Sequence, residues 1–552
     1  MNTPHLHGPI AVIGAGTMGI GIAQVAAQAG HSVLLFDANR EAAGQALDNL
    51  RARLHRRVEA GKADANATKA LLRRITPVNS LHALAPCGLV IEAIVEQLDA
   101  KQHLFQQLES ICSPQTLFAS NTSSLSITAI AGVLSAPQRM AGLHFFNPAP
   151  LMKLVEIVQG LETSPQTVAT LNTLVTHWKK QPVICRSTPG FIVNRIARPF
   201  YAEALRALEE QIADPATLDA VLKESGGFAM GPLQLMDLIG HDINYTVTQS
   251  LFHAFYCDPR FQPSLRQKEL VDANHLGRKR GRGFYPYDIS PHDTKGNNGK
   301  KETQLQPKIA PKHLHAKTQK PPMRIKATGH WAALPHFVAL LQQAELQKPE
   351  LQQQYGITFE ESNNDRFHCP TLQIDDILLR LTKGRTCAQI ADEIRSPVMQ
   401  FDLSANHQSA SIITLSAACQ NTPQQTAKVI GFLQSLGKQV ILLPDYPALL
   451  TMRTVAMLCN EALDAVNKGI ASAEDIDLAM RYGVNYPIGP LAWGEQLGWK
   501  HILTTLENLQ KFYGEPRYRP APLLRQLAAG HTQLLLPQTQ KHQKGDDHAR
   551  PR

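Results

Sequence analysis

Residues 9–37, PIAVIGAGTMGIGIAQVAAQAGHSVLLFD, decide the fold of the first part of this chain. An apolar run leads into a helix of small residues, and a second apolar run ends at Asp37. Three glycines lie between the first run and the helix, and they are Gly14, Gly16 and Gly19. This order of strand, glycine loop, helix, strand and acid within about 30 residues is typical of a Rossmann-type fold. In that fold the glycines allow a tight turn that brings a helix N-terminus to a pyrophosphate. The stretch therefore predicts an α/β dinucleotide-binding domain.

The acid at the end of the second strand indicates which dinucleotide is bound. Asp37 can accept a hydrogen bond from the ribose 2′-hydroxyl and would repel a 2′-phosphate. Arg40 lies close by and offers a partner for such a phosphate. We still favour NAD over NADP. A purely structural glycine-rich turn is the alternative, and the ordered set of features disfavours it.

A second stretch, GLHFFNPAPLMKLVEIV at 142–158, carries the candidate catalytic pair. His144 and Glu156 each lie in an apolar run, and the proline-rich segment between the runs indicates a turn. If the runs pair antiparallel about Pro150, the two residues lie opposite each other. A buried carboxylate beside a histidine raises its proton affinity and fixes its tautomer, as a general base requires. The alternative is a core histidine and a glutamate on a solvated strand face.

Composition places the chain among ordinary globular proteins. It has 552 residues, 43% hydrophobic and 18% charged, which suggests roughly three to five domains. We find no apolar run long enough to span a bilayer and no export signal before the first strand. The eight cysteines are scattered without a C-x-x-C pair. We therefore expect free thiols in a reducing cytoplasm, and no metal site.

The formal net charge of +9 is concentrated in one segment. Residues 295–326 contain nine Lys and Arg against one Glu. Residues 289–323, which overlap this segment, lack apolar periodicity. We therefore predict a flexible basic linker at 289–323, with an anion- or nucleic-acid-binding tether as the alternative. Because the rest of the chain is nearly neutral, nucleic acid is a disfavoured partner.

An internal repeat relates the two halves of the chain. A shift of 258 residues brings many residues into register, including Lys180 with Lys438, Arg195 with Arg453, Glu203 with Glu461, Asp219 with Asp477, and Gly231–Pro232–Leu233 with Gly489–Pro490–Leu491. The candidate polar positions are not kept, since His144, Glu156 and Asn194 fall on Asp402, Thr414 and Met452. The second half is thus predicted to be a degenerate copy that has lost its chemistry.

The repeat and the composition together give the expected domains. They are a Rossmann-type domain at 1–186, a helical domain at 187–288, the linker at 289–323, a degenerate α/β domain at 324–445, a second helical domain at 446–533 and a disordered tail at 534–552. Two polar residues stay open at this point. Ser123 is either a helix cap or a substrate hydrogen-bond donor, and Asn194 is either exposed or aimed into a cleft.

Five separated motifs resemble the L-3-hydroxyacyl-CoA dehydrogenase family. They are GAGTMG, SNTSSLSIT, GLHFFNPAPLMKLVEIV, TPGFIVNR and GRGFYPY, in order between residues 14 and 287. The duplicated tail, with GKQVILLPD, RTVAMLCNEALDAV and RYGVNYPIGPLAW, looks like the longer bacterial members associated with phenylacetate catabolism, the 3-hydroxyadipyl-CoA or 3-hydroxybutyryl-CoA dehydrogenases.

The resemblance implies a role for each matching residue. His144 matches the catalytic base and Glu156 its partner, and Ser123 and Asn194 match the residues that hold the substrate's oxygens. The implied cofactor contacts are Asp37, Glu96, Lys101, Asn147 and Lys279. The CoA contacts fall near 49–62, where Arg56 is one candidate. It belongs to an arginine cluster at 51–57 that otherwise fits a solvated helix face.

The implied reaction is NAD-dependent oxidation of a (3S)-3-hydroxyacyl-CoA to the 3-oxoacyl-CoA. Two other functions remain open, namely a dehydrogenase of free β-hydroxy acids or sugar acids, and a non-catalytic NAD-binding scaffold. Family members with one copy dimerise through the helical domain. We therefore expect either a homo-oligomer or pairing of the two helical domains within one chain.

Overall fold

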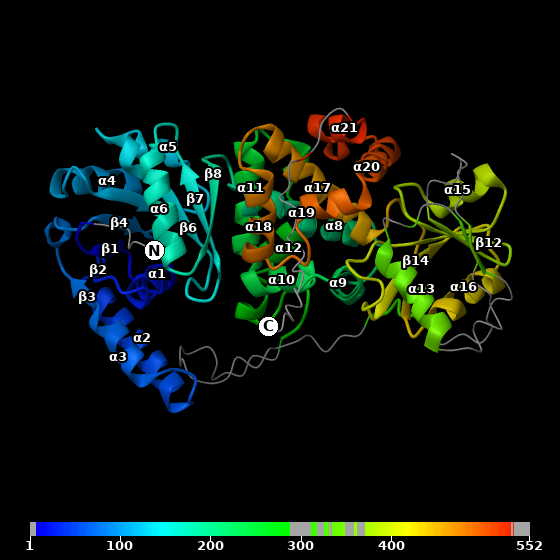
Figure 1. Cartoon of the computed structure of the whole chain (residues 1–552), viewed down its shortest axis with the longest axis horizontal. Helices are drawn as coiled ribbons and strands as arrows, with labels where there is room; N and C mark the ends of the chain where they lie inside the picture. Colours follow the sequence, from blue (N-terminus) through cyan, green and yellow to red (C-terminus); the bar gives the residue numbers. More distant parts are fainter. Residues whose placement is uncertain are drawn as a thin grey trace, which may run out of the picture.

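The computed structural model describes residues 7–287, 311–316, 325–328, 331, 334–347, 358–360, 370–530 and 534. Two sheet domains lie at opposite ends of the molecule, and the helices of both halves lie between them (Figure 1). Most of the predicted linker 289–323 and the predicted tail after Leu534 lie outside the described residues. None of the helices in the described part of the chain is long and apolar enough to cross a membrane.

The first sheet has eight strands in the order β3-β2-β1-β4-β5-β6-β7-β8. Strands β3, β2, β1, β4, β5 and β6, in that order across the sheet, are all parallel. Strand β6 pairs antiparallel with β7, and β7 pairs parallel with β8. The strands are β1 Ile10–Ile13, β2 Val33–Phe36, β3 Ile75–Val78, β4 Leu89–Glu92, β5 Leu117–Ser120, β6 Met140–Phe145, β7 Leu154–Gln159 and β8 Gln181–Arg186. The expected Rossmann-type domain is thus extended by a hairpin and one further strand.

Six helices accompany this sheet: α1 Thr17–Gln28, α2 Ala42–Glu59, α3 Ala65–Arg73, α4 Leu98–Ile111, α5 Ile127–Ala131 and α6 Pro165–His177. Their starts follow local rules. Asp64 caps α3, and Ser164 caps α6 with Pro165 at its first position, because a side-chain oxygen can satisfy an unpaired N–H there and proline has none to lose.

The helical region contains elements from both halves. The first half supplies α7 Val193–Ile196, α8 Arg198–Glu209, α9 Pro215–Ala220, α10 Pro232–Ile239, α11 His241–Ala254 and α12 Leu265–Asp272. The second supplies α17 Leu450–Asn467, α18 Ala473–Gly483, α19 Pro490–Leu497, α20 Trp499–Tyr513 and α21 Pro522–Ala528. One helix cap is present twice: Asp219 accepts the Leu233 N–H of α10, and Asp477 accepts the Leu491 N–H of α19.

Reciprocal ion pairs join the two halves where α8 and α7 face α17. The Nε of Arg195 lies 2.6 Å from Glu461, and the Nε of Arg453 lies 2.5 Å from Glu203. All four side chains are buried. Since Arg195 corresponds to Arg453 and Glu203 to Glu461, the contact has the symmetry of a two-fold interface, within one chain.

The second sheet has seven strands in the order β10-β9-β11-β12-β13-β14-β15. They are β9 Ile325–Thr328, β10 Thr358–Glu360, β11 Thr371–Ile374, β12 Ile377–Leu381, β13 Val398–Phe401, β14 Ile412–Ala417 and β15 Gln439–Leu443, with helices α13 Pro335–Gln347, α15 Cys387–Ile394 and α16 Pro423–Ser435. From β12 to β15 the pairing is parallel, antiparallel and parallel, as it is from β5 to β8.

One part of the predicted linker differs from expectation. Leu314 forms an antiparallel bridge with Ile441 of β15, and the His315 N–H donates to the Val440 carbonyl at 2.8 Å. Residues 311–316 therefore add to an edge of the second sheet. Apolar Leu314 lies among lysines and prolines, and composition alone gave no signal for this pairing.

Candidate active site

The β6–β7 hairpin places His144 directly opposite Glu156, as the sequence predicted. The Nδ1 of His144 lies 2.6 Å from the Glu156 Oε2. The histidine is 6% exposed and the glutamate is completely buried. A contact of this length fixes the imidazole with Nδ1 toward the carboxylate, so that Nε2 is the nitrogen facing away from it.

The second oxygen of Glu156 anchors the helical region. Its Oε1 accepts the backbone N–H groups of Ile192 and Val193, each at 3.0 Å. These groups lie at the start of α7, where backbone donors have no partner within the helix. Hydrogen bonds on both oxygens hold the carboxylate in place, so the orientation of His144 is fixed by two domains together.

Ser123 and Asn194 are brought together at the same junction. The Asn194 Nδ2 donates to the Ser123 carbonyl at 3.4 Å, and Asn194 follows Val193, whose N–H is held by Glu156. Both residues are partly buried. Asn194 lies on the short helix α7, which is separated from α8 at Ala197.

Glu96 organises the loop that carries Ser123. Its Oε1 accepts the Thr122 hydroxyl at 2.6 Å, the Ser123 N–H at 2.9 Å and the Ser124 N–H at 3.1 Å. Burial acts to raise the pKa of Glu96, but these hydrogen bonds and the charge of Lys101 hold that pKa below its usual value. The carboxylate is therefore stabilised in its charged form.

Lys101 is paired with two glutamates. Its Nζ lies 2.6 Å from Glu92 and 3.3 Å from Glu96, and the side chain is 1% exposed. The resemblance implied cofactor contacts for Glu96 and Lys101. In the structure the two residues contact each other and position the Ser123 loop.

The glycine loop fits a pyrophosphate-bearing cofactor. A side chain at Gly14 would meet the Ala93 carbonyl oxygen at 2.4 Å, and one at Gly19 would meet the Gly14 oxygen at 1.7 Å. A Cβ at Gly16 would meet nothing within 4 Å, so open space adjoins the N-terminus of α1, where no side chain caps the helix. Such an N-terminus attracts phosphate.

Asp37 closes the far side of this loop. Its Oδ2 accepts the Ala15 N–H at 2.7 Å, and its Oδ1 accepts the Asn39 N–H at 2.9 Å. It follows the last residue of β2, Phe36, and is partly exposed. Its place beside the glycine loop is the one expected for a ribose ligand.

Three predicted contacts lie outside this cluster of side chains. Asn147 is exposed in the connection after β6. Lys279 forms an ion pair with Asp242 of α11 at 2.5 Å, within the helical region. Arg56 is exposed on α2, where its Nε donates to the Ala52 carbonyl at 3.4 Å.

Sequence reasoning missed several supporting residues. The buried carboxylate of Glu92 accepts from Lys101 and from the Ser120 hydroxyl, each at 2.6 Å, and the Asn121 Oδ1 accepts the Phe145 N–H at 2.8 Å. A charged residue in the apolar run LVIE was the available signal for Glu92. No signal was available for Asn121, because its partner is a backbone group from a distant strand.

Three family models match the chain. The NAD binding domain of 3-hydroxyacyl-CoA dehydrogenase matches residues 9–188. Its C-terminal domain matches twice, at 190–287 and 450–533. A 3-hydroxybutyryl-CoA dehydrogenase reduced Rossmann-fold domain matches 379–447. The two matches of the C-terminal domain confirm the predicted duplication.

Similar proteins cover nearly the whole chain. An Escherichia coli protein named 3-hydroxyadipyl-CoA dehydrogenase is 47% identical, covering 94% of this chain and 97% of that protein. A solved E. coli structure titled 3-hydroxybutyryl-CoA dehydrogenase matches with TM-score 0.80 and 46% identity, over 95% of this chain and 99% of that one. A probable 3-hydroxybutyryl-CoA dehydrogenase of Bacillus subtilis is 42% identical over 50% of this chain and 97% of its own length. The chain therefore belongs to the 3-hydroxyacyl-CoA dehydrogenase family, as an NAD-dependent member that carries a second, degenerate copy of its domains.

Proposed function

We propose that His144 is the general base in the oxidation of a (3S)-3-hydroxyacyl-CoA to the 3-oxoacyl-CoA, with Glu156 as its orienting partner. The Nε2 of His144 takes the proton of the C3 hydroxyl. Glu156 stabilises the imidazolium that forms, through the contact at 2.6 Å. Proton transfer by a positioned side chain contributes roughly 10²–10⁴-fold to the rate.

Other residues bind and orient the reactants. Ser123 and Asn194 hold the oxygens of the acyl group, and Glu96 keeps the Ser123 loop in position. The glycine loop and Asp37 hold the dinucleotide, with Lys101, Asn147 and Lys279 as further residues of its site and Arg56 toward the CoA. When bound, NAD⁺ supplies the acceptor for the hydride that leaves C3.

The observation that carries this proposal is the buried His144–Glu156 contact, which has no counterpart in the second copy. There Asp402 and Thr414 occupy the two positions. They follow the last β13–β14 pair, Phe401 with Leu415, and the Asp402 N–H donates to the Thr414 carbonyl at 2.9 Å. The packing was retained and the acid–base pair was not. This contrast supports a role for the pair in chemistry beyond folding.

Two substrates are supported by the names of similar proteins, 3-hydroxyadipyl-CoA and 3-hydroxybutyryl-CoA. Both are CoA thioesters of short 3-hydroxy acids, and they differ at the distal end of the acyl chain. We infer a cytoplasmic setting from the seven described cysteines, which are all free thiols. We also infer that the second copy replaces the second subunit of a dimer.

NADH oxidation with acetoacetyl-CoA and with free acetoacetate tests this function. We expect turnover of the thioester and little turnover of the free acid. In the Glu156→Gln variant, kcat should fall by orders of magnitude while NADH still binds. Preference for free acetoacetate would instead support a dehydrogenase of free acids, and unchanged kcat in the variant would remove Glu156 from the mechanism.

A further inference from the structure

Arg198 is a buried arginine whose charge is not matched by a carboxylate in the described part of the chain. It is 5% exposed. Its Nε donates to the Asn194 carbonyl at 2.9 Å and its Nη1 to the Thr248 hydroxyl at 3.2 Å. The neighbouring buried arginines Arg195 and Arg260 both contact Glu461. A buried charge without a counter-ion is costly, so a position that keeps one is a candidate for binding an anion.

Two tyrosines lie near this guanidinium: Tyr201 lines the same cavity, and Tyr486 packs against Phe200 and Phe228. The guanidinium lies over the ring of Tyr201, at 4.8 Å from the ring centre. Tyr486, from the second copy, is buried, and its hydroxyl has no hydrogen-bond partner among the residues that the structure describes. Burial lowers the pKa of Arg198. The phenol groups of Tyr201 and Tyr486 act to raise that pKa, because their electrostatic interaction favours the charged guanidinium. Phenol hydroxyls and a guanidinium are the donors that bind a carboxylate.

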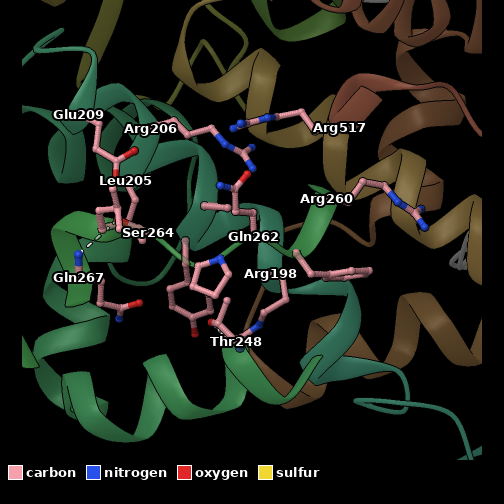
Figure 2. A pocket seen from close by; sticks show the side chains of 15 residues that line it. Arg198, Leu205, Arg206, Glu209, Thr248, Arg260, Gln262, Ser264, Gln267 and Arg517 are labelled. Atoms are coloured by element: carbon pink, nitrogen blue, oxygen red, sulfur yellow. Dashed lines mark hydrogen bonds between the residues drawn. The ribbon is translucent and has the colours of Figure 1, made fainter. Parts of the chain in front are cut away.

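Arg198 and Tyr201 line a cavity of about 140 Å³ in the helical region. Figure 2 shows Arg198 beside Thr248, with Arg206 and Arg517 on the opposite side of the cavity. Those two arginines are ion-paired with Glu203 and Glu515 respectively. Arg260, which also lines the cavity, is paired as well. Arg198 thus differs from the other three arginines of the lining.

The position of Arg198 relates the cavity to the acyl group. Its guanidinium is held at the carbonyl of Asn194, the residue proposed to hold the substrate's oxygens. Asn194 lies on α7 and Arg198 begins α8, and the hydrogen bond of 2.9 Å from the Arg198 Nε to the Asn194 carbonyl spans the break between the two helices. In a six-carbon dicarboxylic acyl chain only two methylene groups separate C3 from the distal carboxyl carbon. The distal group is therefore short enough to meet Arg198 while C3 stays near Asn194.

We propose that Arg198, with the hydroxyls of Tyr201 and Tyr486, is the receptor for the distal carboxylate of a dicarboxylic 3-hydroxyacyl-CoA. The proposal rests on the proposed function and names its substrate class. Because Tyr486 comes from the second copy, the degenerate half supplies a residue to the working site.

The test uses the full chain and three 3-oxoacyl-CoA substrates with NADH. They are 3-oxoadipyl-CoA, 3-oxohexanoyl-CoA, which has the same chain length and a neutral end, and acetoacetyl-CoA. For the unmutated protein we expect kcat/KM to be roughly 10–100-fold higher for 3-oxoadipyl-CoA than for 3-oxohexanoyl-CoA, as a charge-assisted contact provides. A ratio near one would overturn the proposal.

Variants identify the residue responsible. Arg198→Met should bring the ratio of 3-oxoadipyl-CoA to 3-oxohexanoyl-CoA close to one. Tyr486→Phe, which removes only a hydroxyl, should lower it several-fold. Arg517→Met is the matched control, because Arg517 lines the same cavity and is already paired; it should leave the ratio unchanged. If Arg198→Met does not fold, Arg198→Lys and Tyr486→Phe decide the question.

The outcomes separate this inference from the proposed function. No turnover of any of the three thioesters would refute the function itself. Turnover of acetoacetyl-CoA and 3-oxohexanoyl-CoA, together with an unchanged ratio in Arg198→Met and Tyr486→Phe, would refute only the receptor. A ratio lowered equally by Arg517→Met would also refute it, since the general charge of the cavity would then be responsible.

Discussion

Glu156 has two tasks in the first copy, and the second copy keeps only one of them. Glu156 contacts His144 and accepts the N–H groups at the start of α7. In the second copy Asp402, at the position of His144, accepts the N–H of Thr451 at 2.7 Å and that of Met452 at 2.9 Å at the start of α17. Anchoring of the helix is thus retained by a different residue, and the imidazole is lost. Stability and chemistry are separable at this position.

The buried Asp402 predicts a pH dependence of stability. Burial raises its pKa to about 7, against hydrogen bonds that lower it, compared with about 3.9 for an unfolded Asp. Between these values the folded protein holds a proton that the unfolded chain does not, so the free energy of unfolding falls as pH rises. From pH 5 to pH 8 the Tm of the unmutated protein should therefore fall more than that of Asp402→Asn. Burial also raises the pKa values of Asp219 and Asp477, but both residues are present in the two proteins and contribute equally. Parallel pH profiles of Tm would therefore contradict the assignment of the effect to Asp402.

Asp37 predicts the cofactor preference. Asp37→Ala removes the proposed ribose acceptor and the acceptor of the Ala15 N–H, so we expect NADH to bind roughly 10-fold more weakly or worse. NADPH should remain a poor substrate, because the variant loses the Asp37 contact that holds the Ala15 N–H of the glycine loop, whichever cofactor is offered. Fluorescence titration with NADH and with NADPH measures the two dissociation constants. Equal use of the two cofactors by the unmutated protein would contradict this role.

At the scale of elements, the glycine loop and the β6–β7 hairpin were predictable because their signals are local. Fixed glycine spacing and two apolar runs about a turn are properties of neighbouring residues. The break between α7 and α8, the pairing of Lys101 with Glu92 and the position of Arg198 were not predictable. They depend on contacts between segments far apart in the chain, and a periodic pattern does not say which segments meet.

Lys180 and Lys438, which correspond in the internal repeat, have the same structural role. The Nζ of Lys180 donates to the carbonyls of Ala149 and Met152 at 2.6 and 2.7 Å, in the connection between β6 and β7. The Nζ of Lys438 donates to the equivalent connection in the second sheet, at 2.7 Å from the Gln408 carbonyl. Each lysine satisfies several carbonyls that the turn leaves unpaired.

This pair predicts a difference between two matched variants. Lys180→Met and Lys438→Met each leave several carbonyls without a partner, so both should lower Tm. Only Lys180→Met loosens the hairpin that carries His144 and Glu156, so only it should also lower kcat, several-fold. Thermal unfolding and steady-state turnover measure the two effects. Equal loss of kcat in both variants would argue against the assignment of the site to the first copy.

At the scale of the whole molecule, the two helical domains form a self-complementary contact. Arg195 contacts Glu461 and Arg453 contacts Glu203, which are equivalent pairs under the repeat. The Bacillus subtilis relative contains only one such half. A chain with two halves makes internally the contact that a single-copy chain would need a second molecule to make.

Truncation tests this arrangement. Deleting residues 289–552 exposes buried Arg195 and Glu203 together on one face. Because that face is self-complementary, we expect the fragment to dimerise, with Arg195 of one chain beside Glu203 of the other, or to aggregate. Light scattering measures the outcome. A stable, soluble monomer would show that the second copy is not needed to cover this surface.

We propose one working base, His144, in a chain with two copies of the fold. Steady-state NADH formation from 3-hydroxybutyryl-CoA by His144→Gln and by its second-copy counterpart Asp402→Asn tests it most directly. We predict that His144→Gln lowers kcat roughly 10²–10⁴-fold, while Asp402→Asn keeps kcat within about three-fold. Near-normal turnover in His144→Gln, or an equal loss in both variants, would contradict a catalytic base confined to the first copy.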